Sequence, residues 1–295
     1  MSIGSVFRYF RQTKHITLKS ASQDIVSIPF LSRFENGKTD ISFTHLLALL
    51  NRINVQLSEF EFLYQKQQLS EFDLLPAFQH AYQNGEVEKI KIYLQKWQKI
   101  PGQFASLQCL QLKMMLATLD AGSVSPAELK RLVAYFQKLD NWTFFELYLF
   151  GHSIPFLSLP TMLNLFTELQ KQEIIYDDFR HDNFSILFYI YNNVILCLLD
   201  HGQLTNASML VDHLTAIFAH RDKDYYHRTR IFNLKGLTLY LQGKKKLGLR
   251  LIKRANLITY LVQHETRFIT NEKNYLAKYL TPAELRAVFD LADDV

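Results

Sequence analysis

Three histidines, at positions 213, 220 and 227, recur at a constant heptad spacing and are the first side chains whose type and spacing could do chemistry. Imidazole is a common metal ligand, so a stripe of this kind is a candidate metal site. Residues 213 and 220, however, would lie two helical turns apart, about 10 Å at roughly 1.5 Å of rise per residue. His227 is expected on the next helix. The spacing therefore favours solvated or partly buried imidazoles, and we predict no metal site.

Other candidates for catalysis are sparse. Cys109 and Cys197 stand alone, so there is neither a CxxC site nor a disulfide framework. The carboxylate pairs at 177–178 and 293–294 fall in an apparent loop and at the end of the chain. The sequence lacks a glycine-rich phosphate loop, an HExxH zinc motif and a GxSxG nucleophile motif. We therefore predict neither an enzyme nor a cofactor.

Positive charge is concentrated at the start of the chain. Residues 1–57 contain seven arginines and lysines against three acids, whereas bases and acids are almost balanced in the rest of the chain. A local basic excess is expected where a protein meets a polyanion. The first fifth of the chain is therefore the candidate nucleic-acid interface.

Hydrophobic spacing in this basic segment predicts five short helices. Apolar residues recur at helical spacing over 3–10, Thr17 and Ser27 are suited to cap the next two helices, and Asn36-Gly37 to end the third. A capping box over 58–61 is expected to open the fifth. The fourth helix is expected to bury one face made of Phe43, Leu46, Leu47, Leu50 and Ile53. This layout, with a tight connection between the second and third helices, is typical of a helix-turn-helix domain.

The segments "FRYFRQTKHIT" and "SIPFLSRFENGKTDISFTHLLALL" resemble the helix-turn-helix of phage repressors, an XRE-like domain. Within that class they are most similar to the Rgg group of peptide-responsive regulators, part of the RRNPP superfamily. The chain length, the domain order and the "FENG" signature agree with this group. In the broader class, an arginine of the first helix forms a buried ion pair with a glutamate that ends the recognition helix. The resemblance implies this pair for Arg11 and Glu35.

A recognition helix presents its N-terminal residues to the major groove, and its flanks contact phosphates. The residues expected at these places are Ser27, Ile28, Pro29, Phe30 and Arg33 in the groove, and Thr17, Lys19, Lys38 and Thr39 on the phosphates. Leu18 replaces the glutamine usual in the class, and a leucine side chain cannot make that polar contact to the DNA backbone. Pro29 and Phe30 replace small polar residues, so base reading is expected to rely on DNA shape or thymine methyl groups.

Beyond a polar boundary at residues 65–71, helical patterning covers almost the whole chain and repeats internally. The motifs "SPAE" at 125–128 and "TPAE" at 281–284 each combine an N-cap hydroxyl, proline at N1 and glutamate at N3. Aligning the segment that starts at Ile190 with the one that starts at Ile231 gives seven identities, among them Asn192 with Asn233 and Gly202 with Gly243. Helix pairs that repeat at this spacing, 41 residues from Ile190 to Ile231, are typical of tetratricopeptide-like or HEAT-like solenoids. We expect pairs near 73–98, 103–139, 142–172, 184–219 and 225–262, followed by a helical cap.

The predicted fold is therefore all-α. Residues 1–66 are expected to form a five-helix helix-turn-helix domain, and residues 67–295 a tetratricopeptide-like superhelix. Low glycine and proline contents agree with a helix-rich chain. The apolar runs are too short for a membrane span, and we expect a cytoplasmic protein without a membrane partner.

A solenoid of this kind offers a concave groove lined by the first helix of each pair. The candidate ligand-binding residues are Tyr189, Asn192, Tyr226, Arg230 and Asn233. The asparagine amides could bond an extended peptide backbone, with Arg230 as a cation suited to a carboxylate. Packing or capping roles for both asparagines remain the alternative. The resemblance to Rgg-type regulators implies a short, mostly hydrophobic signalling peptide.

We predict a homodimeric, DNA-binding transcriptional regulator of quorum sensing, which reads paired sites in double-stranded DNA and responds to a peptide. One alternative is a tetratricopeptide-like protein–protein adaptor that does not bind DNA. Another keeps DNA binding but has a groove that is vestigial or tuned to a small molecule. The sequence does not decide the operator, the peptide, or whether the peptide activates or inhibits.

Overall fold

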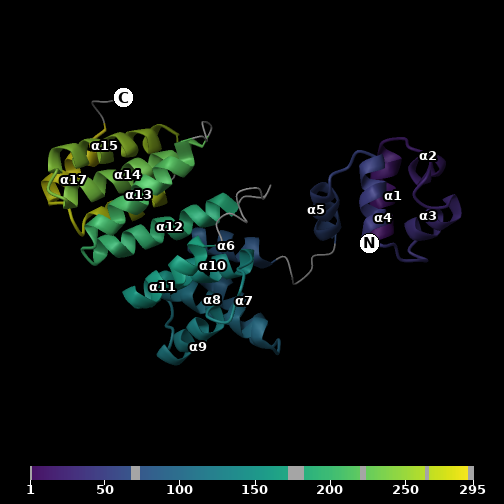
Figure 1. Cartoon of the computed structure of the whole chain (residues 1–295), viewed down its shortest axis with the longest axis horizontal. Coiled ribbons are helices and arrows are strands. Elements are labelled where there is room, and N and C mark those ends of the chain that lie inside the picture. Colours follow the sequence, from purple (N-terminus) through teal and green to yellow (C-terminus); the bar gives the residue numbers. More distant parts are fainter. Residues whose placement is uncertain (1, 68–73, 172–182, 220–223, 263–265, 292–295) are drawn as a thin grey trace. The chain divides into compact units, whose positions relative to one another are not determined.

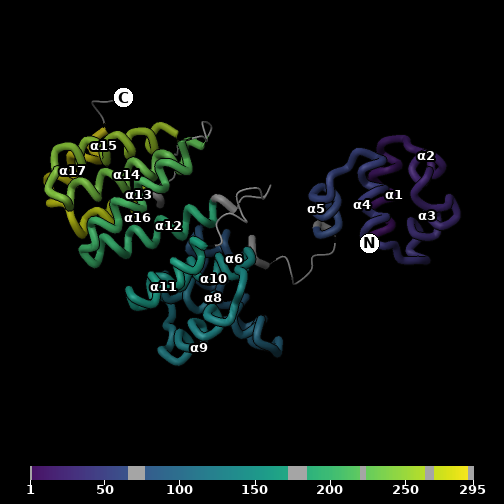
Figure 2. The backbone as a smooth tube through the Cα atoms, in the orientation of Figure 1, coloured from purple at the N-terminus to yellow at the C-terminus, as the bar shows by residue number. Residues whose placement is uncertain are grey.

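The structure is a computed structural model that describes residues 2–67, 74–171, 183–219, 224–262 and 266–291. Every regular element in these ranges is helical, and Figures 1 and 2 follow the helices along the chain. The chain divides into two compact units, the N-terminal unit of residues 1–86 and the repeat unit of residues 87–295. The prediction of an all-α chain is confirmed.

The N-terminal unit begins with short helices that are capped by hydroxyl side chains. Its helices are α1 (Ile3–Thr13), α2 (Leu18–Ser22), α3 (Ile28–Glu35), α4 (Phe43–Arg52), α5 (Leu57–Gln67) and α6 (Leu74–Gln83). Ser2, Thr17, Ser27 and Ser42 each accept a hydrogen bond from the backbone N–H three positions later, which satisfies one otherwise unpaired donor at each helix start. The caps expected at Thr17 and Ser27 are therefore present.

A compact apolar core holds the first five helices together. It contains Val6, Phe7, Ala21, Leu31, Phe34, Leu46, Leu49, Leu50, Ile53, Val55 and Phe60. Helices α1 and α3 approach closely because Gly4 has no side chain: a β-carbon there would lie 1.8 Å from the carbonyl oxygen of Phe34. The close approach fixes α3 against α1.

Two details of this unit differ from expectation. Of the face predicted for α4, Leu46, Leu50 and Ile53 are in the core, but Leu47 is half-buried outside it and Phe43, the first residue of the helix, is 61% exposed. The fifth helix begins at Leu57, and the carboxylate of Glu59 accepts the backbone N–H of Gln56 at 2.8 Å. The predicted capping box at 58–61 is therefore wrong, since the chain enters the helix earlier, directly after Gln56.

The repeat unit consists of helices that pack against their neighbours along the chain. Its elements are α7 (Val87–Trp97), α8 (Gln103–Thr118), α9 (Pro126–Phe136), α10 (Phe144–Ser153), the 3-10 turn η1 (Ile154–Phe156), α11 (Leu159–Gln170), α12 (Asn183–Asp200), α13 (Leu204–Ala219), α14 (Tyr225–Leu241), α15 (Lys245–Val262), α16 (Thr266–Leu276) and α17 (Pro282–Phe289). The capping boxes at Ser125–Glu128 and Thr281–Glu284 are both formed. These bounds match the helices predicted for each pair, with α16 and α17 as the C-terminal cap.

The internal alignment of Gly202 with Gly243 corresponds to real structural repetition. Gly202 follows α12 and Gly243 follows α14, with φ of 68° and 88°, the left-handed conformation that glycine adopts without strain. Gly248 allows α14 and α15 to touch, because a β-carbon there would lie 2.5 Å from the carbonyl oxygen of Gly236. The two helices accordingly lie side by side (Figure 2).

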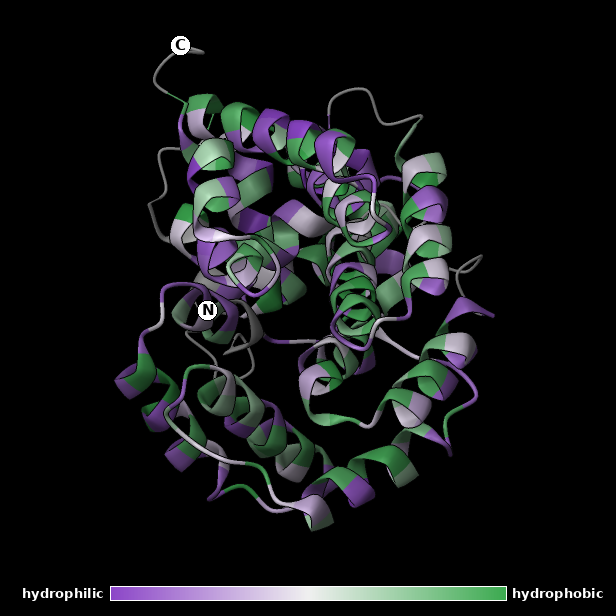
Figure 3. Ribbon diagram, turned by 90° about the vertical axis from the view of Figure 1, so that its left-hand side faces the viewer, coloured by the Kyte–Doolittle hydropathy of each residue, from purple (hydrophilic) through white to green (hydrophobic). Residues whose placement is uncertain are grey.

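A single apolar core runs through the repeat unit from Leu107 on α8 to Val288 on α17. Hydrophobic and hydrophilic residues alternate around most helices (Figure 3), as expected for amphipathic helices that bury one face. In the part of the chain that the structure describes, no helix combines the length and apolar character needed to cross a bilayer.

The division into units differs from the predicted boundary after residue 66. The predicted boundary falls at the end of α5, whereas the compact units keep α6 with the first five helices. As a result, the first predicted pair, α6 and α7, is divided between the two units. The domain boundary after residue 66 stays a prediction.

Candidate nucleic-acid interface and ligand cavity

Helix α3 is tied to α1 by a buried pair of charges. The guanidinium of Arg11 donates from Nε to Oε1 of Glu35 at 2.6 Å and from Nη2 to Oε2 at 2.7 Å. Its Nη1 donates to the carbonyl oxygen of Ile16 at 2.7 Å, which also fixes the chain leading into α2. Hydrogen bonding to Glu35 raises the pKa of Arg11, and burial opposes this only in part. The pair therefore sets the position of α3 relative to α1.

A second contact holds the C-terminal end of α3. Arg8 of α1 donates from Nη1 to Oδ1 of Asn36 at 3.0 Å, and Asn36 donates from Nδ2 to the carbonyl oxygen of Ser32 at 2.7 Å. Gly37 follows with φ of 69°. Sequence reasoning identified Asn36-Gly37 as a helix end but missed Arg8, which lies on a different helix and has no local signal.

The N-terminal end of α3 is open to solvent. Ser27 caps the helix, Ile28 is 43% exposed, and Pro29 and Arg33 are exposed, while Phe30 is half-buried. No described residue forms a hydrogen bond or ion pair with the Arg33 side chain. The guanidinium is thus free to bond a guanine edge or a phosphate.

The residues expected to contact phosphates flank the same two helices. Thr17 caps α2, and Lys19 is exposed in its first turn. Lys38 is exposed just after α3, and Thr39 is half-buried there. The helices α1 to α4 have no acidic residue in their first turns, so nothing there opposes the approach of an anion.

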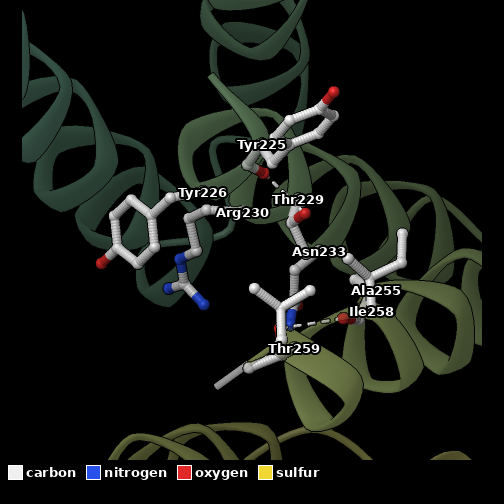
Figure 4. A pocket seen from close by; sticks show the side chains of 9 residues that line it. Tyr225, Tyr226, Thr229, Arg230, Asn233, Ala255, Ile258 and Thr259 are labelled. Atoms are coloured by element: carbon white, nitrogen blue, oxygen red, sulfur yellow. Dashed lines mark hydrogen bonds between the residues drawn. The ribbon is translucent and has the colours of Figure 1, made fainter. Parts of the chain in front are cut away.

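The repeat unit contains a cavity of about 90 Å³ between α14 and α15. It is lined by Tyr225, Tyr226, Thr229, Arg230 and Asn233 of α14 and by Ala255, Ile258, Thr259 and Val262 of α15 (Figure 4). The hydroxyls of Thr229 and Thr259 donate hydrogen bonds within their own helices, to the backbone carbonyl oxygens of Tyr225 and Ala255. The wall that remains is mostly apolar.

Asn233 contributes an amide to this wall that is left without a hydrogen bond. Its side chain is only 6% exposed, and no described residue forms a hydrogen bond with its amide. Neither amide atom is among the described polar atoms that are sealed from solvent without a partner, so the amide stays open to the cavity. The amide therefore presents its N–H donors and its carbonyl acceptor to whatever enters the cavity.

Arg230, in contrast, already bonds two described side chains. Its Nε donates to Oδ1 of Asn192 on α12 at 2.8 Å, and its Nη1 forms an ion pair with Glu272 of α16, which is 7% exposed. Asn192 in turn donates from Nδ2 to Oδ1 of Asn193 at 3.0 Å. Helices α12, α14 and α16 are thereby linked to one another. Glu272 was missed by sequence reasoning, because it lies far from Arg230 along the chain, in a segment without a recognisable repeat.

The family of the chain follows from matches to family models over both units. Residues 87–266 match the C-terminal domain of the HTH-type transcriptional regulator Rgg, and residues 7–60 match a helix-turn-helix family. The chain belongs to the Rgg family. This family consists of transcription regulators, and the helix-turn-helix match covers the residues expected to meet DNA.

Solved structures of other proteins share the fold of this chain over nearly its whole length. The pheromone (SHP) receptor Rgg2 of Streptococcus dysgalactiae superposes with a TM-score of 0.77 at 20% identity, over 94% of this chain and 100% of that chain. A candidate transcriptional regulator from Listeria monocytogenes EGD-e superposes with a TM-score of 0.79 at 20% identity, over 94% of this chain and 97% of that chain. A bacterial peptide pheromone/receptor complex superposes with a TM-score of 0.71 at 15% identity, over 93% of this chain and 98% of that chain. The likeness confirms the predicted fold, a helix-turn-helix domain followed by tetratricopeptide-like helices.

Of the five residues predicted to bind a ligand in this Rgg-family chain, Tyr226, Arg230 and Asn233 line the cavity, and Asn192 is joined to it through Arg230. Tyr189 lies elsewhere. Its ring packs against Gly151 of α10, where a β-carbon would lie 2.9 Å from it, and its centroid is 5.7 Å from that of His152. Tyr189 faces the neighbouring helix because it is one helical turn away from Asn193, which also contacts Gly151.

The histidines of the heptad stripe are dispersed. His227 bonds Asp224 through Nδ1 at 2.7 Å and packs against Phe188, with ring centroids 4.4 Å apart. His213 lies beside Tyr191, and His220 falls outside the described residues. Within the described ranges, no group of three or more histidine, cysteine or acidic side chains is arranged to hold a metal ion.

Proposed function

We propose that this Rgg-family regulator binds promoter DNA through α3 and binds a short, mostly hydrophobic signalling peptide in the cavity between α14 and α15. Membership of the family carries the regulatory part of the proposal. The observation that carries the peptide part is Asn233, a residue 6% exposed whose amide has no described hydrogen-bond partner and is open to a mostly apolar cavity. An amide of this kind can both donate to and accept from a peptide backbone. The pheromone receptors that share the fold support the same class of ligand.

The proposed DNA contacts are those predicted from the sequence. The start of α3 would enter the major groove with Arg33 reading a base or a phosphate, while the start of α2 and the segment after α3 hold the backbone. The exposed, unpaired Arg33 and the buried Arg11–Glu35 pair support this assignment. Specificity would rest partly on Ile28 and Pro29, whose apolar surfaces suit thymine methyl groups.

The proposed regulator works in the cytoplasm as a homodimer without enzymatic activity. Two recognition helices related by a two-fold axis would read paired half-sites. The peptide would bind two arrangements of the dimer with different affinities and so shift the balance between them. Residues 1–66 would supply the DNA-binding domain, and residues 67–295 the peptide site and the dimer contact.

Genome-wide capture of DNA bound by the tagged protein in its own host tests the DNA part, with Arg33→Ala as the comparison. Enrichment of one or a few paired sites that is lost in the variant is expected. Equal enrichment with both proteins, or none, would reject α3 as the recognition helix and favour the adaptor interpretation. Sedimentation of the purified chain checks the dimer.

Titration with synthetic peptides encoded beside the gene tests the peptide part. Asn233→Ala is expected to weaken binding about tenfold, because the truncated wall loses its backbone partner. Asn206→Ala, an exposed asparagine on α13, serves as the matched control. Unchanged affinity in Asn233→Ala would place the ligand elsewhere.

A further inference from the structure

Arg230 is the one charged side chain among the nine described residues that line the cavity. Its charge is already met, because Glu272 reaches it from α16. Both side chains are almost fully removed from water, at 12% and 8% exposure. Any ligand in the cavity therefore meets a neutral ion pair and not an isolated cation.

A ligand carboxylate could reach Arg230 in two ways: by displacing Glu272 from Nη1, or by accepting a hydrogen bond from Nη2, for which no described partner is found. The displaced carboxylate would then be buried without a partner, because no other described cation bonds it. Desolvation makes such a state costly, and the attraction between Arg230 and a new carboxylate would replace an equivalent attraction that is already present. A carboxylate added at Nη2 would instead leave two buried negative charges against one guanidinium. Neither arrangement offers a net gain for an acidic group.

An uncharged ligand faces no such obstacle. Tyr226, Ile258 and Val262 offer apolar surface, and the Asn233 amide is open beside them. A peptide segment with an apolar side chain and an intact backbone amide satisfies both features without disturbing the pair. The features of the wall match the interior of a peptide better than its carboxyl terminus.

We propose that Glu272 determines the specificity of the cavity, by masking Arg230 so that the site takes an uncharged apolar residue and its backbone amide and discriminates against a carboxylate. This inference rests on the proposed peptide function and refines it, since Arg230 was expected from the sequence to receive a carboxylate. Glu272 is not among the residues that line the cavity, and it acts through Arg230.

Calorimetric titration of the full-length protein with two matched probes tests the inference. The neutral probe is N-acetyl-leucyl-phenylalaninamide, and the acidic probe is N-acetyl-leucyl-phenylalanine, which differs only in its free carboxylate. Wild type is expected to bind the neutral probe more tightly. In Glu272→Gln, which keeps the shape and one acceptor oxygen, affinity for the acidic probe should rise about tenfold or more, because a charge-assisted bond to Arg230 becomes available.

Two further variants separate this effect from damage to the fold. Arg230→Gln/Glu272→Gln removes both charges, and both probes should bind it within about twofold of wild type, since a neutral pair replaces a neutral pair. Glu128→Gln breaks the ion pair of Lys113 and Glu128 between α8 and α9, outside the cavity, and should leave both affinities unchanged. If Glu272→Gln does not fold, the double variant still decides: a loss of affinity for the acidic probe there would show that Arg230 attracts carboxylates in the wild type.

The outcomes that overturn the inference are distinct from failure of the proposed function. A wild-type preference for the acidic probe, or an unchanged ratio of the two affinities in Glu272→Gln, rejects Glu272 as the specificity determinant but keeps the cavity as a ligand site. Absence of binding of both probes by all four proteins rejects the cavity as a ligand site, and the inference with it.

Discussion

Arg11 and Glu35 face each other edge to edge in the core of the N-terminal unit, joined by two nearly equal hydrogen bonds of 2.6 and 2.7 Å. One residue lies on α1 and the other ends α3, so the geometry of the pair fixes the helix that is proposed to enter the major groove. Burial removes water from both charges, and this desolvation offsets much of their attraction. The pair therefore contributes positioning more than net stability.

Removing one partner should nevertheless be severe. Glu35→Gln leaves the buried guanidinium of Arg11 with an uncompensated charge, and we expect about 3–5 kcal/mol of destabilisation. Arg11→Met/Glu35→Leu removes both charges and should remain close to wild type in stability. Hydrogen exchange of peptides from residues 2–67, followed against urea concentration, measures both effects.

The control for this prediction is Glu88→Gln in α7, which breaks an exposed pair with Lys91 and should cost less than about 1 kcal/mol, measured by the same exchange experiment on peptides that cover α7. A cost for Glu35→Gln no larger than that of Glu88→Gln would contradict the role assigned to the buried pair.

Gly4→Ala should damage the same helix arrangement without touching a charge. The new β-carbon would lie 1.8 Å from the carbonyl oxygen of Phe34 and 2.6 Å from its carbonyl carbon, so α1 and α3 must separate. Overpacking of this kind costs about 1–3 kcal/mol. Because the backbone of α3 moves, affinity for the captured DNA sites should fall as well, measured by fluorescence anisotropy. Gln12→Ala, on the exposed side of α1, should change neither quantity.

Local signals explain which parts of this structure could be predicted from sequence. Hydroxyl residues before apolar runs predicted the caps at Thr17 and Ser27, and a repeated glycine predicted the turns at Gly202 and Gly243. Such features depend on a few neighbouring residues, so their sequence patterns are sufficient. The fold class followed because helical periodicity and the repeat length extend over most of the chain.

Non-local contacts explain what could not be predicted. The Arg230–Glu272 pair joins two helices that are distant along the chain, and nothing near Glu272 distinguishes it from a solvated acid. Gly4 reads only as a small residue inside a helix until Phe34 is placed against it. Tyr189 was expected at the ligand site because of helical spacing alone, which does not tell which neighbouring helix a side chain will face.

Arg33→Ala should separate base reading from phosphate binding. Loss of a bidentate contact to guanine would cost about 1–3 kcal/mol and relax specificity at one base pair, with the salt dependence retained. Loss of a phosphate contact would weaken binding to all sequences and reduce the slope of log affinity against log salt by about one. Anisotropy titrations at several salt concentrations distinguish the two. Arg250→Ala, an exposed arginine on α15, is the matched control, and an equal effect of both variants would indicate only a general electrostatic contribution.

His152 should make the repeat unit sensitive to acid. The imidazole is buried on α10, where its Nδ1 donates to the carbonyl oxygen of Tyr148 at 2.7 Å. Burial lowers the pKa of His152 from 6.5 to about 4, although the bond to Tyr148 acts in the opposite direction. Between these pH values His152 binds a proton in the unfolded chain but not in the folded chain. The stability that the neutral, buried His152 contributes is therefore complete above pH 6.5 and is lost as the pH falls towards 4.

Comparison with His152→Gln isolates this contribution from that of the other histidines. Between pH 7.5 and pH 5, wild type should lose about 2 kcal/mol more stability than the variant, from linkage applied to the shifted and ordinary pKa values. Urea unfolding at the two pH values measures the difference. The variant itself should be less stable than wild type at pH 7.5, because glutamine fills the aromatic site between Tyr148 and Tyr189 poorly. Equal losses of stability in both proteins would mean that His152 takes up its proton in the folded chain as readily as in the unfolded one.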